Sequence, residues 1–564
     1  MKNIYVLLIG LFFWNEMLSQ AKYYEKSIGW TNVQQGHRIV ALNDTTYFVL
    51  GRQLSVNENF AKSFGVFLNQ YGDTVQREVY PTSRPFYFAE IVPTSKGYLL
   101  TGCYEHIGDS CTSALIELNH QREYQKTMLI GNEEYRSIAD FITPTTDNGF
   151  LLGGHITKES GFWIPYLIKI DEDGNKLWEK TYPLNSSNHH SIRDLLPAKG
   201  GGYYLLILNN LNFFTSPPQG NILLMKIDEE GNKEWQKIYN FGEVDQAGLF
   251  IHTSDGGLLL GSQIQNYISA FIKLDNNFEV EWISEEVYPD CYMIKIIELE
   301  DGSFVSAGCY EWDGETQKND AKIAKMDAAG NVLWERKYGG EDDDYFYDMI
   351  QTPDGGYLMT GRTESLPEPG ANVYLIKTNC MGLLTEPQTS FSAEQDPDNS
   401  LTYHFTNLSE YVYPDSIDGG HFLWDFGDGA TSEELHPTHS YANKGESRIV
   451  TLTAIVCSDT SRFDIKVVTG EEIVGIEGVD GLPAFSFKMY PNPTSSGQVF
   501  VDYDLPKEGL LQLYDLQGKE VGNWILGIRY SQVDLDLGDF VEGMYLYRLT
   551  CGGAFLKGGK LVVE

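Results

Sequence analysis

A short segment that combines a tight turn with an apolar strand recurs seven times in this chain. The clearest copy reads Asp354-Gly355-Gly356-Tyr357-Leu358-Met359-Thr360-Gly361. The other copies begin, at spacings of 46 to 55 residues, at Asp44, Ser95, Asp147, Gly200, Asp255 and Asp301. Gly, Asp and Asn tolerate the positive φ that hairpin turns need. Each copy therefore predicts two strands joined by a tight turn.

A second apolar segment follows each of these turns. Its strong copies begin at Leu167, Leu224, Phe271 and Ile323 and lead to Trp178, Trp235, Trp282 and Trp334. Its weaker copies begin at Phe67, Leu115 and Leu375. Each repeat thus holds four short apolar or alternating runs, which predict strands. Four strands in a repeat of about 50 residues are typical of a β-propeller blade.

The repeats predict an all-β fold with a seven-bladed β-propeller over residues 22–387. The last repeat lacks a clear Trp-Glu-Lys strand after Asn379, whereas Tyr23-Tyr24-Glu25-Lys26-Ser27 resembles Leu177-Trp178-Glu179-Lys180-Thr181. We therefore expect residues 22–28 to supply the outer strand of the last blade and to join the ends of the ring. The repeated tryptophans are expected to pack between blades.

Residues 388–470 carry a different pattern, Trp424-Asp425-Phe426-Gly427-Asp428-Gly429 followed by His436-Pro437-Thr438-His439-Ser440-Tyr441. This segment resembles the PKD-type β-sandwich family, whose members carry a WDFGDG turn and a following HxY-type strand start. Alternation from Ile449 to Val456 suits a sandwich strand. A linker is expected over residues 471–484.

Residues 485–564 resemble the C-terminal sorting domain of the type IX (Por) secretion system. The matching motifs are Tyr490-Pro491-Asn492-Pro493, Leu513-Tyr514-Asp515-Leu516-Gln517-Gly518-Lys519, Gly543-Met544-Tyr545-Leu546-Tyr547-Arg548-Leu549 and Lys560-Leu561-Val562-Val563. The resemblance implies a small β-sandwich, handling by the type IX machinery, and a protein secreted or displayed on the outer surface of a Gram-negative bacterium.

The N-terminus independently predicts export. Lys2 precedes a short apolar run from Ile4 to Trp14, and Ser19-Gln20-Ala21 offers small residues for cleavage. Residues 1–21 are therefore expected to be a signal peptide. No later stretch is long and apolar enough to cross a bilayer. The formal net charge of −38 disfavours nucleic acid and anionic membranes as partners.

Export would place the seven cysteines in an oxidising environment, where disulfides persist. Cys103 and Cys111 flank a predicted hairpin loop, and Cys291 and Cys309 flank a predicted turn, so both pairs are candidate bridges. The cysteines without an evident partner are Cys380, Cys457 and Cys551. Sequence leaves the connectivity open.

No constellation of residues predicts a catalytic or cofactor-binding site, and none is assigned. The sequence has no Gly-x-Ser-x-Gly elbow, no His-Glu-x-x-His pair and no Gly-rich phosphate loop before a helix. His189-His190 is the only adjacent histidine pair, and we expect it in a polar loop between strands. Neighbouring side chains of an extended chain point in opposite directions, so the pair would chelate one metal poorly.

Calcium is the one cofactor that the sequence leaves open. Glu341-Asp342-Asp343-Asp344, near Asp348, offers the oxygen ligands that calcium takes, although a solvated acidic loop is the favoured interpretation. Asp171-Glu172-Asp173-Gly174-Asn175 resembles a calcium loop, but its recurrence at Asp228 and Asp327 indicates hairpin chemistry. Asp425 and Asp428 are interpreted as parts of a hairpin turn beneath a core Trp424.

Three functions agree with these patterns. The first is a surface binding or adhesion protein, not an enzyme, whose propeller displays loops to a glycan or protein ligand. The second is a polysaccharide hydrolase or lyase, which should show two or more acids with shifted pKa values at the channel mouth. The third is a structural matrix component, which needs self-association. Propellers host binding proteins and enzymes alike, so the fold cannot decide.

Overall fold

The structure is a computed structural model that divides into two compact units, Met1–Glu386 and Pro387–Glu564. It describes residues 22–29, 33–54, 61–80, 86–105, 111–132, 134–159, 161–184, 188–212, 219–242, 245–264, 268–284, 288–289, 293–310, 318–366, 371–412, 420–470, 486–490, 498–505, 509–514, 520–527, 531–537, 540–541, 543–551 and 554–563. The predicted signal peptide and linker lie outside these residues. All named elements are strands, so the predicted all-β fold is confirmed. The described residues contain no helix long and apolar enough to span a membrane.

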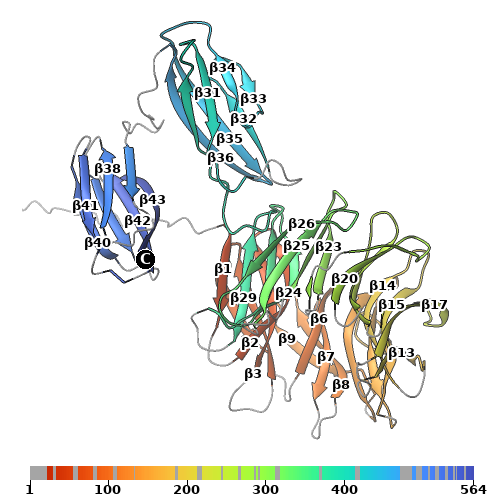
Figure 1. The fold of residues 1–564 in the computed structure, drawn as a ribbon. Coiled ribbons are helices and arrows are strands. Elements are labelled where there is room, and N and C mark those ends of the chain that lie inside the picture. Colours follow the sequence, from red (N-terminus) through yellow and green to blue (C-terminus); the bar gives the residue numbers. More distant parts are fainter. Residues whose placement is uncertain are drawn as a thin grey trace, which may run out of the picture. The chain divides into compact units, whose positions relative to one another are not determined.

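The described part of the first unit consists of seven antiparallel sheets (Figure 1). Six follow chain order: β2 (Val33–Asn43), β3 (Thr46–Leu54), β4 (Ala61–Asn69), β5 (Thr74–Val79); β6 (Phe86–Thr94), β7 (Gly97–Glu105), β8 (Cys111–Asn119), β9 (Tyr124–Leu129); β10 (Arg136–Pro144), β11 (Phe150–Thr157), β12 (Trp163–Ile170), β13 (Lys176–Thr181); β14 (His189–Pro197), β15 (Tyr203–Asn212), β16 (Gln219–Ile227), β17 (Lys233–Tyr239); β18 (Gln246–His252), β19 (Leu258–Ile264), β20 (Ile268–Leu274), β21 (Val280–Ile283), with β22 (Tyr288–Pro289) on β20; and β23 (Met293–Glu298), β24 (Phe304–Tyr310), β25 (Asp320–Met326), β26 (Val332–Tyr338). The seventh combines β27 (Asp344–Gln351), β28 (Tyr357–Thr363) and β29 (Asn372–Thr378) with β1 (Tyr24–Ile28).

The first strands of the seven sheets contact one another in sequence, from β2 through β6, β10, β14, β18 and β23 to β27, and β27 contacts β2 again. They therefore surround a central channel, as in a β-propeller. Because the strands are antiparallel, the first and third turns of every sheet share one face of the ring, which we call the turn face. The opposite end, where second strands lead to third strands, is the loop face.

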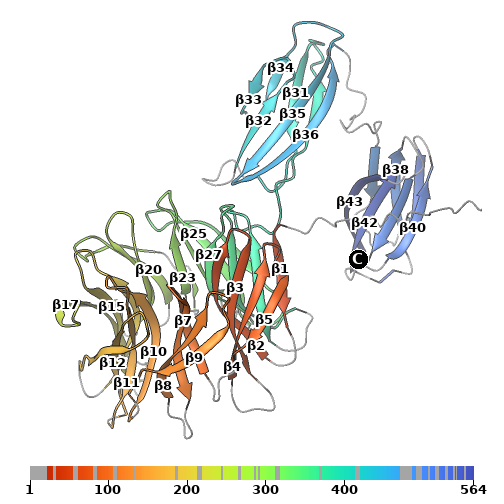
Figure 2. The ribbon, with the colours of Figure 1, turned by 180° about the vertical axis from the view of Figure 1, so that it is seen from behind.

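The last sheet closes the ring with the N-terminal strand, as predicted. Strand β1 pairs with β29, and Tyr24 lies opposite Lys377 (Figures 1 and 2). Trp178 lies opposite Lys169 in the same register of the third sheet. Lys26 Nζ reaches the third turn of the first sheet through Tyr71 O at 2.7 Å. The two segments matched in the sequence therefore occupy equivalent positions.

The repeated Asp of the first turn and the repeated Lys of the third strand form an ion pair. The pairs, with their Nζ–Oδ distances, are Lys169–Asp147 at 2.7 Å, Lys273–Asp255 at 2.7 Å, Lys325–Asp301 at 3.4 Å and Lys377–Asp354 at 2.9 Å. All four lysines are buried, and a buried ammonium needs such a partner. Both repeated motifs therefore meet at the turn face.

The repeated tryptophans pack between sheets, which confirms their predicted role. At Gly231, a Cβ would lie 2.7 Å from Trp178 Cη2 of the preceding sheet, and at Gly330 a Cβ would lie 2.7 Å from Trp282 Cζ3. Tyr182 Oη donates to Gly231 O at 2.7 Å across the same contact. The third turns share a residue with positive φ: Gly72, Arg122, Gly174, Gly231, Phe278, Gly330 and Gly382.

The second unit begins with a sandwich of two sheets. One contains β30 (Phe391–Gln395), β31 (Thr402–Asn407) and β34 (Thr438–Ser440); the other contains β33 (Thr431–Ser432), β32 (His421–Asp425), β35 (Ser447–Val456) and β36 (Asp459–Val468). The fully buried Trp424 packs against Phe391 and Phe405 between them. Its neighbour Asp425 ends β32 and Asp428 lies in the turn that follows, which agrees with their interpretation as hairpin residues.

Two further sheets complete the second unit. One contains β37 (Ser486–Tyr490), β38 (Gln498–Asp504) and β41 (Ser531–Asp536); the other contains β40 (Glu520–Leu526), β39 (Gly509–Tyr514), β42 (Gly543–Cys551) and β43 (Ala554–Val563). Buried Val499, Leu511, Leu549 and Leu561 share one core cluster. Alternating apolar residues therefore place one face of each sheet inside.

Cys103 and Cys111 form a disulfide across the strands β7 and β8, as the sequence suggested. Cys309 is also disulfide-bonded, whereas Cys291 lies outside the described residues. Cys380 and Cys457 are disulfide-bonded as well. No partner for either was evident from the sequence, because spacing along the chain does not determine disulfide connectivity.

Candidate functional site

Every first strand carries a β-bulge at the same level of the channel. The bulged residues are His37, Ala89, Asp140, Arg193, Gly248, Ile294 and Tyr347. The residues that follow them are Arg38, Glu90, Phe141, Asp194, Leu249, Lys295 and Asp348. Bulges re-aim side chains and often lie beside functional sites. Charged side chains therefore gather at one level of the ring.

Several of these charges join neighbouring sheets. Arg38 Nε lies 3.0 Å from Glu90 Oε1, and Lys295 Nζ lies 3.3 Å from Asp348 Oδ1. Asp348 Oδ2 also accepts the backbone N–H of Ile39 at 3.0 Å. Strand β2 is an edge strand of its sheet, so the carboxylate supplies an acceptor for a backbone N–H of this edge. These contacts hold the ring together.

Two channel carboxylates have raised pKa values. Burial raises the pKa of Asp194 to about 7, against the opposing effect of the backbone N–H groups of Phe250 and Leu195. Burial also raises the pKa of Asp140, which Arg193 and Arg38 oppose. The raised pKa values of Asp194 and Asp140 therefore share burial as their main cause.

Asp194 has a structural role of its own. Its Oδ1 accepts the N–H of Leu195 at 2.8 Å, and its Oδ2 accepts the N–H of Phe250, in the next sheet, at 3.0 Å. This arrangement matches that of Asp348 and Ile39. Both oxygens of Asp194 are therefore engaged: Oδ1 accepts within strand β14, and Oδ2 joins strand β14 to strand β18.

An aromatic and histidine cluster lies at the loop face between the third and fourth sheets. Trp163 stacks on His155 at 4.6 Å between ring centroids and contacts His189 edge-on at 4.7 Å. Phe162 contacts His189 at 5.3 Å, and Trp163 N donates to His189 Nδ1 at 3.3 Å. Phe162, Trp163 and His189 are partly exposed. The cluster therefore offers ring surface and a polar edge to solvent.

The histidine pair lies in strand β14, so its placement in a polar loop was wrong. His190 is buried, and its Nδ1 lies 3.0 Å from Asn209 Oδ1, whereas His189 faces Trp163. The two rings point in opposite directions, as expected for an extended chain. The polar sequence before the pair suggested a loop, but strand β14 already begins at His189.

The side chains at one equivalent position of the second strands differ from sheet to sheet near the loop face. In chain order they are Arg52, Cys103, His155, Leu208, Gln263, Cys309 and Arg362. The turn face, by contrast, repeats its Asp–Lys pairs and positive-φ residues. The side chains that distinguish one sheet from another therefore lie near the loop face.

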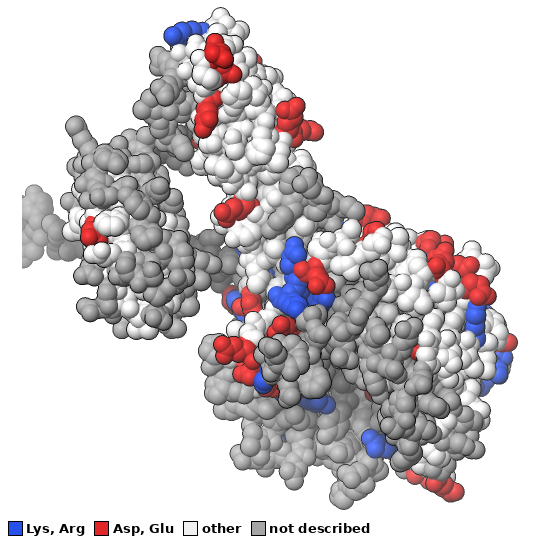
Figure 3. All heavy atoms as spheres, viewed as in Figure 1, with Lys and Arg blue, Asp and Glu red and all other residues white. Residues whose placement is uncertain are grey.

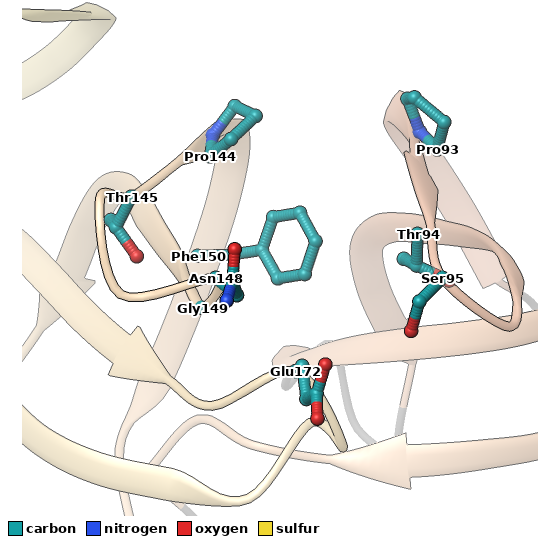
Figure 4. Close-up of a pocket in the computed structure, with 9 residues that line it drawn as sticks. All are labelled: Pro93, Thr94, Ser95, Pro144, Thr145, Asn148, Gly149, Phe150 and Glu172. Atoms are coloured by element: carbon teal, nitrogen blue, oxygen red, sulfur yellow. The ribbon is translucent and has the colours of Figure 1, made fainter.

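A pocket of about 440 Å³ lies on the turn face between the second and third sheets. Figure 4 shows the Phe150 ring projecting into the space between the turns that carry Ser95 and Asn148, with Glu172 below. A similar pocket of about 380 Å³, lined by Asp44 and Tyr47 among others, lies between the last and first sheets. Both pockets arise at equivalent turns, so sheet packing accounts for them.

The acidic segment at residues 341–344 is held by hydrogen bonds. Asp343 Oδ1 accepts the N–H of Asn319 at 2.9 Å, and the buried Asp344 accepts the N–H of Gly340 at 3.1 Å. Asp342 pairs with Lys318 at 3.0 Å. Within the described ranges, no group of three or more His, Cys, Asp or Glu side chains is placed to hold a metal ion.

The hairpin at Asp171 has the geometry that its recurrence predicted. Asp171 Oδ1 accepts the N–H groups of Asp173 and Asn175 at 3.0 and 2.8 Å. Gly174 has a φ of +82°. The acidic side chain therefore completes a turn.

In the sandwich of the second unit, Asp428 forms a polar contact with a stacked histidine. Asp428 Oδ2 lies 2.8 Å from His439 Nε2, and the His439 ring stacks on Phe426 at 4.2 Å. Tyr441 Oη donates to Phe426 O at 3.0 Å. The two motifs that carried the family resemblance thus contact each other.

Acidic side chains form small separate groups in the view of Figure 3, and basic side chains lie beside them.

Known proteins match separate parts of the chain. Residues 488–564 match the family described as "Secretion system C-terminal sorting domain". The PKD1 domain from the Vibrio cholerae metalloprotease PrtV is 30% identical, with coverage of 15% of this chain and 98% of that chain and a TM-score of 0.12. No curated protein matches the chain.

Two solved structures are similar to part of the chain at low identity. The β-propeller domain of the Trilobed protease from Pyrococcus furiosus is 10% identical, with coverage of 62% of this chain and 96% of that chain and a TM-score of 0.36. A polysaccharide lyase of family PL25, an ulvan lyase, is 9% identical, with coverage of 63% and 96% and a TM-score of 0.43.

Proposed function

Because the chain carries the C-terminal sorting domain of proteins that the type IX system secretes to the cell surface or extracellular space, and a PKD-type domain, we propose that its propeller is the ligand-binding module of a surface protein. The ligand is a glycan or a protein. The PKD-type domain serves as a spacer or as a second binding module.

One observation supports this proposal. The side chains at equivalent positions of the loop face differ from sheet to sheet, whereas the ion pairs of the turn face repeat. The equivalent positions Arg52, His155 and Gln263 carry different chemistry, whereas the turn-face ion pairs repeat in four sheets. Binding residues typically lie at the variable end of a rigid scaffold. The partly exposed Trp163 cluster supplies the aromatic surface on which many interfaces depend.

The test is a binding screen that also detects turnover. Purified full-length protein is incubated with polysaccharide and surface-protein panels, and bound ligand and released reducing sugar are measured together. We expect saturable binding without sugar release. Release of sugar would overturn the proposal in favour of an enzyme. Concentration-dependent self-association without ligand binding would favour a matrix component.

A polysaccharide hydrolase or lyase is the second candidate, and the raised pKa of Asp194 favours it. A carboxyl group with a pKa near 7 has the protonation state that a general acid needs. The two hydrogen bonds that Asp194 accepts from the backbone of Leu195 and Phe250 favour a structural role for Asp194 over a catalytic one. If Asp194 is catalytic, Asp194→Asn will abolish sugar release by the protein.

Asp194→Asn is expected to change the pH dependence of stability. The pKa of Asp194 in the folded protein, about 7, lies above the usual value of 3.8. Its contribution to the stability of the folded state is therefore fully present below pH 4 and is lost as pH rises to 7. Asparagine does not titrate, so the stability of Asp194→Asn lacks this pH dependence. It also leaves one backbone N–H without a carboxylate oxygen, at a cost of about 1–3 kcal/mol.

Thermal denaturation from pH 4 to 8 measures both effects. The stability advantage of the native protein over Asp194→Asn should shrink as pH rises from 4 to 7. The exposed Asp44 on the turn face provides the control variant Asp44→Asn. A constant difference across this range would contradict the raised pKa of Asp194, and no difference at any pH would contradict its structural role.

A further inference from the structure

Two arginines distinguish the first and last sheets from the other five. Arg52 lies opposite Gln35 in the first sheet, and Arg362 lies opposite Tyr345 in the last. At the equivalent position the other sheets carry Cys103, His155, Leu208, Gln263 and Cys309. Strand β2 contacts β27 and β28, so the two arginine-bearing sheets are neighbours in the ring. Figures 1 and 2 show these sheets side by side at the closure.

Three aromatic rings stack beside these arginines. His37 and Tyr347, the bulged residues of the two sheets, stack at 4.9 Å with an angle of 7° between their planes. Tyr345 continues the stack on Tyr347 at 6.3 Å and 4°. All three side chains are partly exposed. Such a stack presents a flat apolar surface with polar edges.

Guanidinium groups surround this stack. Arg52 and Arg38 add to burial in lowering the pKa of His37 to about 3, so this imidazole is neutral at pH 7. Burial raises the pKa of Tyr347, and Arg362 and Arg52 oppose that rise. Arg38 Nη1 also donates to Tyr347 O at 3.4 Å. Positive charge therefore reaches the ring stack from both sheets.

The carboxylates of Glu90, Asp348 and Asp343 contact groups other than Arg52 and Arg362, whereas Glu364 pairs with Arg362 itself. Glu90 pairs with Arg38, and Asp348 with Lys295 and the Ile39 N–H. Asp343 accepts from Asn319, and Glu364 pairs with Arg362. Arg52 Nη2 donates to the neutral Gln35 Oε1 at 3.4 Å. An anionic ligand would therefore share Arg362 with its partner Glu364, while the other three carboxylates keep their own partners.

We propose that the loop face between the first and last sheets binds an acidic sugar unit, with its carboxylate or sulfate on Arg52 and Arg362 and its ring against Tyr347 and His37. Planar guanidinium groups match the oxygens of both anions. This inference rests on the proposed binding function and names its ligand class. An inorganic anion such as sulfate would bind to the arginines but would not pack against the stacked rings.

The test compares binding of polygalacturonate, dextran sulfate, dextran and inorganic sulfate to the full-length protein by calorimetry. We expect at least one acidic polysaccharide to bind at least about tenfold more tightly than dextran and inorganic sulfate. Arg52→Ala and Arg362→Ala should each weaken that binding by about 10- to 100-fold, as expected for a lost hydrogen bond to a charged group. Arg362→Lys keeps the positive charge but loses the planar guanidinium group. Its affinity should therefore lie between those of the native protein and Arg362→Ala.

Arg77→Ala is the matched control, because Arg77 is exposed on the outer strand β5 of the first sheet. It should bind like the native protein. Denaturation curves establish that each variant is folded, and Arg362→Lys tests the site if an alanine variant is not.

The outcomes separate this site from the proposed function. Binding of only neutral glycans or proteins would leave the proposed function standing and overturn the acidic-sugar site. Equal affinities of Arg52→Ala, Arg362→Ala and Arg77→Ala for an acidic polysaccharide would do the same. Tighter binding of inorganic sulfate than of any polysaccharide would reduce the site to a simple anion site. Absence of all ligand binding would overturn both.

Discussion

Removal of residues 22–28 is expected to destabilise the propeller by at least about 5 kcal/mol, because the last sheet loses its outer strand. Strand β1 is paired along its length with β29, and Tyr23 and Tyr24 are buried. Loss of one large buried aromatic side chain alone costs about 3–5 kcal/mol. Glu25 also accepts a hydrogen bond from the Tyr374 hydroxyl across this pairing. Chemical denaturation of the full chain and the shortened variant measures the difference.

A synthetic peptide of residues 22–28 should restore part of the lost stability, because it can add to the open edge of β29. Ser27→Ala in the intact chain is the control, since the strand is kept. Thermal denaturation provides a second comparison of the intact and shortened chains. Thermal midpoints that agree within about 2 °C would contradict the closure, because a loss of even 1 kcal/mol shifts the midpoint by about that amount.

Gly330→Ala should lower the free energy of unfolding by about 3 kcal/mol, because two costs coincide at this turn. The φ of Gly330 is +85°, a conformation that costs other residues about 1–2 kcal/mol. The added Cβ would also lie 2.7 Å from Trp282 Cζ3 of the preceding sheet. Overpacking of this kind costs about 1–3 kcal/mol.

Gly302→Ala separates these two costs within the same sheet. Gly302 has a φ of +79°, and a Cβ there would have no atom within 4 Å. Its substitution should cost only about 1–2 kcal/mol. Urea denaturation of both variants gives the comparison, and equal losses would show that contact with Trp282 does not matter. Phe278 adopts the same backbone conformation in the fifth sheet, where it packs 4.7 Å from Trp235.

The sequence predicted the repeating parts of the fold because they obey local rules. Asp and Gly at the turns, alternating strands and the Tyr24–Trp178 match each needed only a few neighbouring residues. The Lys169 position was visible as a repeated polar residue in an apolar strand, and its ion pair with Asp147 follows from the hairpin order. The same rules identified the turn at Asp171.

The candidate sites were missed because they depend on differences between repeats. Arg52 and Arg362 lie 310 residues apart in the chain (362 − 52 = 310), and only closure of the ring makes their sheets neighbours. The bulges at His37 and Tyr347 have no sequence signal that distinguishes them from ordinary strand residues. An alignment of the seven repeats, with attention to the positions that differ, would have indicated Arg52, His155 and Arg362.

The pairing of Tyr24 with Lys377 also sets the order of events in folding. The two partners are 353 residues apart (377 − 24 = 353), so contact order is high for this sheet and its formation is slow. During synthesis or passage through a pore, the first strand emerges hundreds of residues away from its partner along the chain. We therefore expect closure of the ring to be the last step in folding of the propeller.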